Sequence, residues 1–205
     1  LEQARRHGAW IVEDDYDSEF RFAGRPIPSM QGMEPQAPVI YVGTFSKTLY
    51  PGLRTGYMVL PPMWVEPFHK AHADLYREGH LMTQAALADL LSEGHYASHI
   101  RRMRIVYQRR RALLMDLIRT RLGADGLHDE SDAGLHLVLH LDPSVYDVQI
   151  ERAAQQRGLL VRALSRYYQG GSPKRGLLLG YACVPDEAIE PAFERLLASL
   201  EDVGL

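Results

Sequence analysis

Short apolar runs alternate along the chain with longer segments of helical periodicity. Three of these runs are typical of strands, and they predict strands at Ala9–Val12, Val39–Val42 and Gly56–Leu60. The first two do not alternate with polar residues, which indicates a sheet that is covered on both faces. A polar segment containing several prolines separates them. The first part of the chain therefore predicts a piece of a parallel α/β sheet.

Helical spacing of apolar residues begins after the third run. It predicts three helices, at Trp64–Arg77, Thr83–Ser92 and His95–Leu122. One side of the last helix carries an apolar stripe, formed by Tyr96, Ile100, Met103, Tyr107, Leu114 and Ile118. A helix of this length can join two domains. We expect the boundary near Gly94, with residues 1–94 in one domain and 95–205 in the other.

The second half of the chain has the pattern of a smaller α+β domain. Turn-forming residues fill 123–134. The expected elements after them are a strand at Leu135–Leu141, a helix at Val148–Arg157, strands at Leu159–Ala163 and Leu177–Ala182, and a helix at Asp186–Val203. At the other end of the chain, Leu1–Gly8 is typical of the end of a helix stopped by glycine. The chain is thus expected to be a fragment of a longer protein.

The composition and charge of the chain argue against several classes of function. The chain has 205 residues, of which 46% are apolar and 24% charged, which is ordinary for a globular protein. The net charge of -3 argues against a nucleic-acid-binding face on this piece, because phosphate contacts need a basic excess. The single cysteine, Cys183, excludes an internal disulfide and fits a reducing, cytoplasmic setting. No apolar run is long enough to span a membrane.

Functional side chains follow the first two predicted strands. Ligands of open α/β sheets bind outside the carboxyl ends of the strands. Lys47 is a lone amine among hydroxyl groups just after an apolar strand, so it is a candidate nucleophile toward a carbonyl. Arg54 is a candidate to hold a phosphate through its planar guanidinium. Together these residues suggest pyridoxal 5'-phosphate (PLP).

PLP needs four kinds of partner, and the chain carries each of them. It needs an amine for its aldehyde, a carboxylate at the pyridine nitrogen, a donor at the ring hydroxyl, and hydroxyl and guanidinium groups at the phosphate. The residues that supply this set are, in that order, Lys47, Asp14, Tyr16, and Thr44 with Ser46 and Arg54. Asp15, Asp17 and Glu19 are expected to be solvated or structural.

Three segments carry a family resemblance. Glu13–Phe22, together with Gly24–Pro28 and Thr44–Tyr57, resembles the MocR-type (GabR-like) transcription regulators of the GntR family. Glu93–Arg104 is similar to their interdomain helix, and Leu177–Val184 to their last small-domain strand. The resemblance implies the end of the large-domain sheet of the PLP-dependent transferase fold type I, followed by a smaller α+β domain. It also implies an N-terminal winged helix-turn-helix in the parent protein.

The resemblance assigns roles residue by residue. Lys47 becomes the Schiff-base lysine, Asp14 the partner of the pyridine nitrogen and Tyr16 that of the ring hydroxyl. The phosphate ligands become Thr44, Ser46 and Arg54. In fold type I enzymes a small-domain arginine often grips the substrate carboxylate, but the strand Leu177–Ala182 has none. We take Arg166 as the candidate for an effector or substrate carboxylate, with Arg162 as a weaker one.

The family also carries parts that this chain lacks. The upstream half of its PLP domain supplies a glycine-rich phosphate loop, a stacking aromatic and an asparagine. Each charge-assisted hydrogen bond contributes about 1.5–3 kcal/mol, so losing two would weaken PLP retention about 10²–10⁴-fold. We therefore expect PLP in the parent protein and weak or absent binding by this fragment. DNA would be contacted only through the missing N-terminal domain.

Three interpretations stay open. The first is an effector-sensing, PLP-binding domain of a bacterial regulator, dimeric and responsive to an amino-acid-like ligand. The second is a working class I/II aminotransferase that moves an amino group between an amino acid and a 2-oxo acid, with Lys47 also as the base. The third is a truncated core whose uncovered sheet edge pairs with another chain.

Two other patterns favour ordinary roles. The arginines between 101 and 111 are expected on the solvated face of the long helix. The pairs His95/His99 and His69/His72 have metal-compatible spacing. Nothing in the sequence completes a site around them, so we expect surface or packing histidines and no metal.

Overall fold

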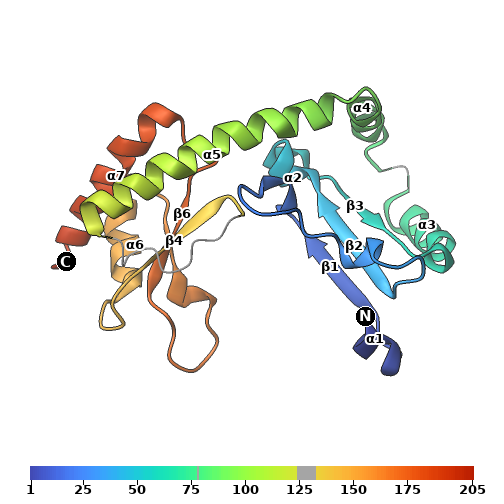
Figure 1. Ribbon diagram of the computed structural model, residues 1–205, viewed down its shortest axis with the longest axis horizontal. Helices are drawn as coiled ribbons and strands as arrows, with labels where there is room; N and C mark the ends of the chain where they lie inside the picture. The colour runs from blue at the N-terminus through green and yellow to red at the C-terminus, as the bar shows by residue number, and fades with distance from the viewer. Residues whose placement is uncertain (78, 124–132) are drawn as a thin grey trace. The chain divides into compact units, whose positions relative to one another are not determined.

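A computed structural model describes residues 1–77, 79–123 and 133–205 (Figure 1). The chain forms two compact units, 1–102 and 103–205, and the division falls inside helix α5 (His95–Leu122). Each unit is described by itself. Most of the turn-rich segment expected at 123–134 lies outside the described residues.

The first unit is built on a three-stranded sheet with the order β1-β2-β3. β1 (Ile11–Asp15) and β2 (Val39–Thr44) are parallel, as expected, whereas β3 (Gly56–Val59) is antiparallel to β2. The direction of β3 follows from the link between the two strands, which is residues 45–55. A parallel crossover needs about a dozen residues or more, usually with a full helix, so this link returns the chain antiparallel.

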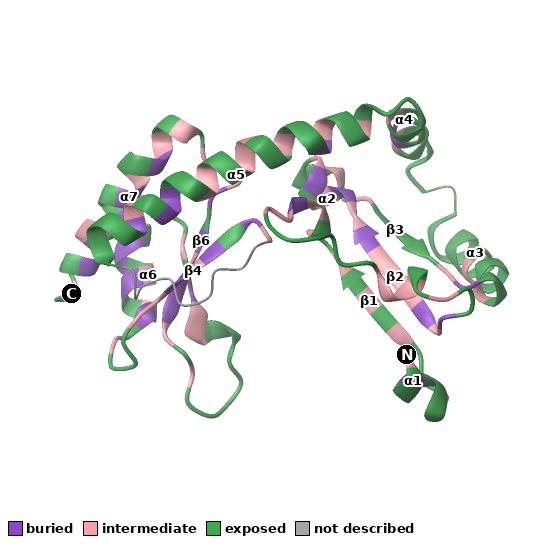
Figure 2. Ribbon diagram, viewed as in Figure 1, coloured by how far each residue is buried: buried purple, intermediate pink, exposed green. Residues whose placement is uncertain are grey.

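Much of this sheet is left uncovered by the described residues, and Figure 2 shows exposed and half-buried residues along β1 and exposed residues along β3. Exposed and half-buried residues alternate along β1, and Val12 is 66% exposed. All of β3 is exposed, with Met58 at 50%. The expectation of burial on both faces is therefore wrong for this chain. The physical reason is that the helices α3 and α4, which follow the sheet in the chain, bury almost none of their own residues in the described structure.

Two helices follow the sheet. α3 (Pro62–Tyr76) has no buried residue, and α4 (Leu81–Ser92) buries only Leu87. α3 is anchored through Trp64, whose ring packs edge-on against Trp10 at a centroid distance of 5.6 Å. A short helix α1 (Glu2–Arg6) precedes β1. The apolar sides of α3 and α4 stay largely uncovered in the described residues.

The second unit contains a fully antiparallel sheet with the order β4-β6-β5. Its strands and helices, in chain order, are β4 (His136–His140), α6 (Asp147–Gln156), β5 (Arg162–Ala163), β6 (Gly176–Gly180) and α7 (Asp186–Glu201). Core residues come from all layers, among them Ile118, Leu139, Ile150, Leu177 and Phe193. The expected α+β character of this half is confirmed.

β5 is shorter than the sequence predicts. Only Arg162 and Ala163 pair with β6, and Leu160 is 92% exposed. The backbone N–H of Leu159 instead donates to the carbonyl of Ala154, at 2.9 Å, and so closes the end of α6. Residues that the apolar pattern assigned to a strand thus belong to the segment that ends helix α6.

The basic face of α5 is only partly a solvated face. Arg110 is mostly buried: its Nε donates to Asp186 at 2.9 Å, and its guanidinium also binds the carbonyl of Ala182. Arg109 pairs with the other oxygen of Asp186 at 2.8 Å. Asp186 opens α7, where a carboxylate is favoured by the helix dipole. For Arg110 the expectation of simple solvation is wrong, whereas the side chain of Arg109 stays 71% exposed.

Candidate cofactor site

The alternation of β1 separates its two aspartates. Asp14 and Tyr16 lie on the open side of the strand. Asp15 points the other way, where it accepts hydrogen bonds from the Tyr41 hydroxyl at 2.7 Å and from the Ser18 N–H at 3.1 Å. Burial and the bond to Asp15 raise the pKa of Tyr41, so this donor stays protonated. Asp15 is therefore structural, and Asp14 is the carboxylate that faces the open side.

Tyr16 has the protonation state that a ring-hydroxyl partner needs. The charge of Asp17, then burial, then the charge of Asp14 raise the pKa of Tyr16 above its ordinary value. The phenol therefore keeps its proton at neutral pH and can donate to an anionic oxygen. Its side chain is half exposed, so a ligand could reach it.

Lys47 lies on α2 (Phe45–Thr48), a single turn that begins where β2 ends. Thr44 caps this turn, because its hydroxyl oxygen accepts the Ser46 N–H at 3.1 Å. The Thr44 hydroxyl can still donate its own hydrogen. The register pairs Asp14 with Val42, two residues before Thr44. The carboxyl ends of β1 and β2 thus bring Asp14, Thr44 and Lys47 to one edge of the sheet.

Arg54 lies at the turn that leads into β3. It has φ 51° and ψ 30°, in the left-handed region that few residues other than glycine adopt. Two residues later, Gly56 pairs with Thr44, and a Cβ at Gly56 would lie 2.8 Å from the carbonyl oxygen of Gly43. The close approach of the two strands therefore requires glycine there. This return brings Arg54 back to the edge that carries Thr44.

The donor set at this edge fits PLP in kind. Its groups are an amine, a carboxylate on an exposed strand face, a protonated phenol, two hydroxyls and a guanidinium. The residues are Lys47, Asp14, Tyr16, Thr44, Ser46 and Arg54, all from the first unit. The backbone N–H of Ser46 is already used by Thr44, so Ser46 can offer only its side chain.

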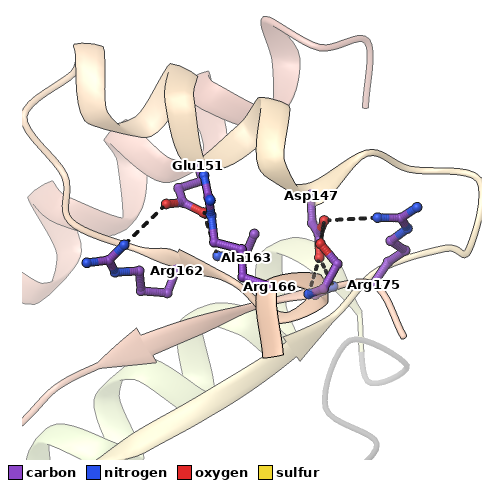
Figure 3. A network of polar contacts seen from close by, with 8 residues as sticks. Asp147, Glu151, Arg162, Ala163, Arg166 and Arg175 are labelled. Carbon is purple, nitrogen blue, oxygen red and sulfur yellow. Dashed lines mark hydrogen bonds and ion pairs between the residues drawn. The ribbon is translucent and has the colours of Figure 1, made fainter. Parts of the chain in front are cut away.

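Arg166 belongs to the second unit, where it takes part in a polar network around α6 (Figure 3). Its Nε donates to Glu151 at 2.7 Å, and the same carboxylate oxygen accepts the Ala163 N–H at 3.0 Å. Arg162 is also within 3.7 Å of Glu151. Both candidate arginines for a ligand carboxylate are thus held by one glutamate, and the side chain of Arg166 is 48% exposed.

Asp147 is the buried member of that network. It accepts hydrogen bonds from the N–H and hydroxyl of Ser165, at 2.9 and 2.6 Å, and from the Gly176 N–H at 3.2 Å. Arg175 approaches it at 3.4 Å. Burial alone would raise the pKa of Asp147, but the bonds from Ser165 and Gly176 outweigh it and hold the pKa below its ordinary value. Asp147 fixes the start of η5 (Leu164–Tyr167), which carries Arg166.

Residues that sequence reasoning did not assign to the site contact the Lys47 turn. His99 Nε2 lies 3.0 Å from the carbonyl oxygen of Thr48, and the Tyr96 ring packs edge-on against Phe45 at 5.8 Å. The Tyr96 hydroxyl bonds Glu19 at 3.3 Å. Burial raises the pKa of Tyr96 to about 12. The signal in the sequence was the spacing of Tyr96, His99 and Ile100, which puts all three on one side of a helix.

Neither a metal centre nor a membrane segment is found in the described ranges. Among residues 1–77, 79–123 and 133–205, no group of three or more His, Cys, Asp or Glu side chains could hold a metal ion. In the same ranges, none of the helices has the length and hydropathy needed to cross a bilayer.

Comparison with known proteins shows to which family the chain is similar. Residues 1–196 match the model of the family described as aminotransferase class I and II. The "Probable rhizopine catabolism regulatory protein MocR" of Rhizobium meliloti is 44% identical over 96% of this chain and 40% of its own length. The "Uncharacterized HTH-type transcriptional regulator YhdI" of Bacillus subtilis (strain 168) is 36% identical over 96% of this chain and 42% of its own.

Solved structures agree on the fold. LysN, an alpha-aminoadipate aminotransferase from Thermus thermophilus, superposes with a TM-score of 0.84 at 24% identity, over 98% of this chain and 52% of that one. The chain spans about two fifths of the length of the two regulators. The family is PLP-dependent, which implies PLP in the parent protein. The chain therefore belongs to the aminotransferase class I and II family, with the fold type I architecture, and its resemblance to the aminotransferase-like part of MocR-type regulators is confirmed.

Proposed function

We propose that this chain is part of the effector-sensing, PLP-binding and dimerising domain of a bacterial transcription regulator. The observation that carries the proposal is the convergence of the two family motifs, Glu13–Phe22 and Thr44–Tyr57, on one edge of the first sheet. The similarity to two regulators over nearly the whole chain supports the regulatory reading.

Each residue at that edge has a distinct task. Asp14 would keep the pyridine nitrogen protonated, and Tyr16 would donate to the ring oxygen. Thr44, Ser46 and Arg54 would hold the phosphate, where the planar guanidinium of Arg54 could contact two oxygens at once. Lys47 would supply the amine that holds the cofactor. When bound, PLP supplies an electron sink for an amine substrate or effector.

The effector would be amino-acid-like, and its carboxylate would be bound by Arg166. The support for this assignment is that Glu151 holds Arg166 through its Nε side, while nearly half of the side chain remains exposed. DNA would be contacted through an N-terminal domain outside these 205 residues. The active form would be a homodimer, as the open sheet face and exposed helices of the first unit suggest.

The same open face supports weak PLP binding by the 205-residue chain alone. Val12, two residues before Asp14 on β1, is 66% exposed, and Met58, on the far side of β2, is 50% exposed, so water competes for each polar contact at this edge. We expect micromolar or weaker affinity for the fragment and tight retention by the full-length protein.

A titration with PLP tests both statements. The full-length protein and the 205-residue chain would be mixed with PLP, reduced with borohydride and analysed by mass spectrometry of the peptide that contains Lys47. The proposal predicts a stoichiometric adduct in the full-length protein and little in the fragment. A full-length protein without any adduct would refute the cofactor assignment, and a stoichiometric adduct on the fragment would refute the weak-binding statement.

The alternative is a working aminotransferase. The observation that favours it is the complete donor set, because in such an enzyme Lys47 would also move the proton between carbon atoms. Turnover of an amino donor and a 2-oxo acid by the full-length protein at enzymatic rates, lost in Lys47→Ala, would establish the alternative. Specific binding to its own promoter DNA without such turnover would establish the regulator.

A further inference from the structure

We propose that His99, on the long helix α5, is a positioning residue that holds the Lys47 turn in place. It would do so by closing the carboxyl end of α2, one residue beyond Lys47. This inference rests on the proposed role of Lys47 as the attachment point of PLP, and it assigns to the site a residue from outside the two family motifs.

The α2 turn cannot hold itself. It contains only Phe45–Thr48, and isolated helices this short are unstable because nucleation is costly. Within the turn, the Leu49 N–H donates to the carbonyl of Phe45 at 2.9 Å. The chain then breaks at Pro51, which has no N–H, so no further helical turn donates N–H groups to the remaining carbonyl oxygens. The carbonyl of Thr48 therefore needs a partner from elsewhere in the fold.

His99 supplies that partner. Its Nε2 lies 3.0 Å from the carbonyl oxygen of Thr48, from a position 51 residues further along the chain. A carbonyl can only accept, so Nε2 must carry the proton. The Arg102 guanidinium lies 3.4 Å from the other ring nitrogen, Nδ1, and donates to its lone pair. The two contacts select one neutral tautomer, whose N–H points at the turn.

The bond is partly buried, and its acceptor belongs to a residue inside the core. Thr48 is 1% exposed and Ile100, the neighbour of His99 on α5, is 7% exposed. One turn of helix earlier, the Tyr96 ring packs edge-on against Phe45, the first residue of α2. Helix α5 thus contacts both ends of the turn: Tyr96 at its start and His99 at its end. Lys47 lies between these two supports.

The test compares four full-length proteins: the unsubstituted form, His99→Leu, His99→Gln and His95→Leu. His99→Leu removes the donor, whereas His99→Gln keeps an N–H at the same reach. His95→Leu is the matched control, because His95 is on the same helix one turn earlier and pairs instead with Glu93 at 3.1 Å. The first measurement uses protein free of cofactor: the hydrogen-exchange rate of the Leu49 amide, which reports on α2 directly.

A hydrogen bond of this kind shifts an equilibrium by about 2- to 12-fold. We expect exchange at Leu49 to accelerate by about that factor in His99→Leu, with recovery in His99→Gln and no change in His95→Leu. Amides of the second unit serve as an internal reference, and their exchange should not change. Equal exchange at Leu49 in all four proteins would overturn the inference.

The second measurement adds PLP and follows its visible absorbance against pH. The inference predicts that His99→Leu shifts the midpoint pH of the absorbance change of PLP attached to Lys47. It also predicts that His99→Leu weakens PLP binding by about the same factor as it accelerates exchange at Leu49. A purely structural role would lower the unfolding temperature and leave this midpoint unchanged. If no protein attaches PLP at Lys47, the proposed function fails, but the exchange result still decides the role of His99 on its own.

Discussion

The two units of this chain use their polar residues in opposite ways. In the second unit, Asp147 is fully buried and its carboxylate is engaged by Ser165, Gly176 and Arg175. In the first unit, Asp14 and Lys47 lie exposed at the edge of an open sheet. Buried polar groups that satisfy one another stabilise a fold, whereas exposed groups gathered at strand ends are available to a ligand. The first unit therefore carries the candidate cofactor residues, whereas the polar groups around Asp147 form a scaffold inside the second unit.

Removal of the Lys47 amine should have the largest effect, and it tests whether the exposed residues of the first unit bind PLP. Lys47→Ala should abolish borohydride-trapped PLP in the full-length protein, because the reduced bond forms only at that amine. Mass spectrometry of the reduced protein measures it. Lys70→Ala, which removes an exposed lysine of α3, is the control and should label as the unsubstituted protein does. Undiminished labelling of Lys47→Ala would place the attachment on another lysine.

Removal of the Asp147 carboxylate tests the scaffold side. Asp147→Ala leaves the N–H of Gly176, the Ser165 groups and Arg175 without their acceptor, so we expect a loss of about 3–5 kcal/mol in the free energy of unfolding. Urea denaturation monitored on the 205-residue chain gives the number. The matched control is Asp142→Ala, an exposed carboxylate that accepts from Ser144, with an expected loss below about 1.5 kcal/mol. Equal losses in both variants would contradict the description of Asp147 as the centre of the scaffold.

Acid should destabilise the scaffold of the second unit. The pKa values of Asp147 and Glu151 lie below their ordinary values, where burial is outweighed by hydrogen bonds from Ser165 to Asp147 and from Ala163 and Arg166 to Glu151. A lowered folded-state pKa gives stability that is full above the unfolded value, about 3.9 for Asp and 4.3 for Glu. Stability is then lost as the pH falls below about 4 through the folded values.

Hydrogen exchange or NMR of the second unit between neutral pH and about pH 2 follows this loss. Asp147→Asn should flatten the pH dependence, since the amide does not titrate. An unchanged slope in that variant would show that other carboxylates carry the acid sensitivity.

The smallest expected effect is at Tyr16. Tyr16→Phe removes one donor to the ring oxygen and should weaken PLP binding to the full-length protein about 5- to 30-fold, because a hydrogen bond between phenol and a partly charged acceptor is involved. Fluorescence or absorbance titration measures the affinity. Tyr50→Phe, at an exposed tyrosine of the same unit, should bind PLP as the unsubstituted protein does. Equal affinities for all three would remove Tyr16 from the site.

Much of the fold could be predicted because its signals are local. The parallel pairing of β1 with β2, the span of α5 and the position of Lys47 after β2 all follow from short-range periodicity and strand-end rules. The predictions that were wrong concern residues whose local pattern was overridden by a contact with a distant part of the chain or with a helix end. The segment 159–161 closes α6 rather than extending β5, and Arg110 is held by Asp186 rather than by water.

The sequence by itself determined the family, the fold class and the residue types of the candidate cofactor site. Only the tertiary structure decided which groups meet. It placed Asp14 and Asp15 on opposite sides of β1. It paired Arg166 with Glu151 and brought His99 to the carbonyl of Thr48. The physical reason is distance along the chain: periodicity encodes the face on which a side chain lies, whereas a hydrogen bond between residues 51 positions apart depends on how the elements pack.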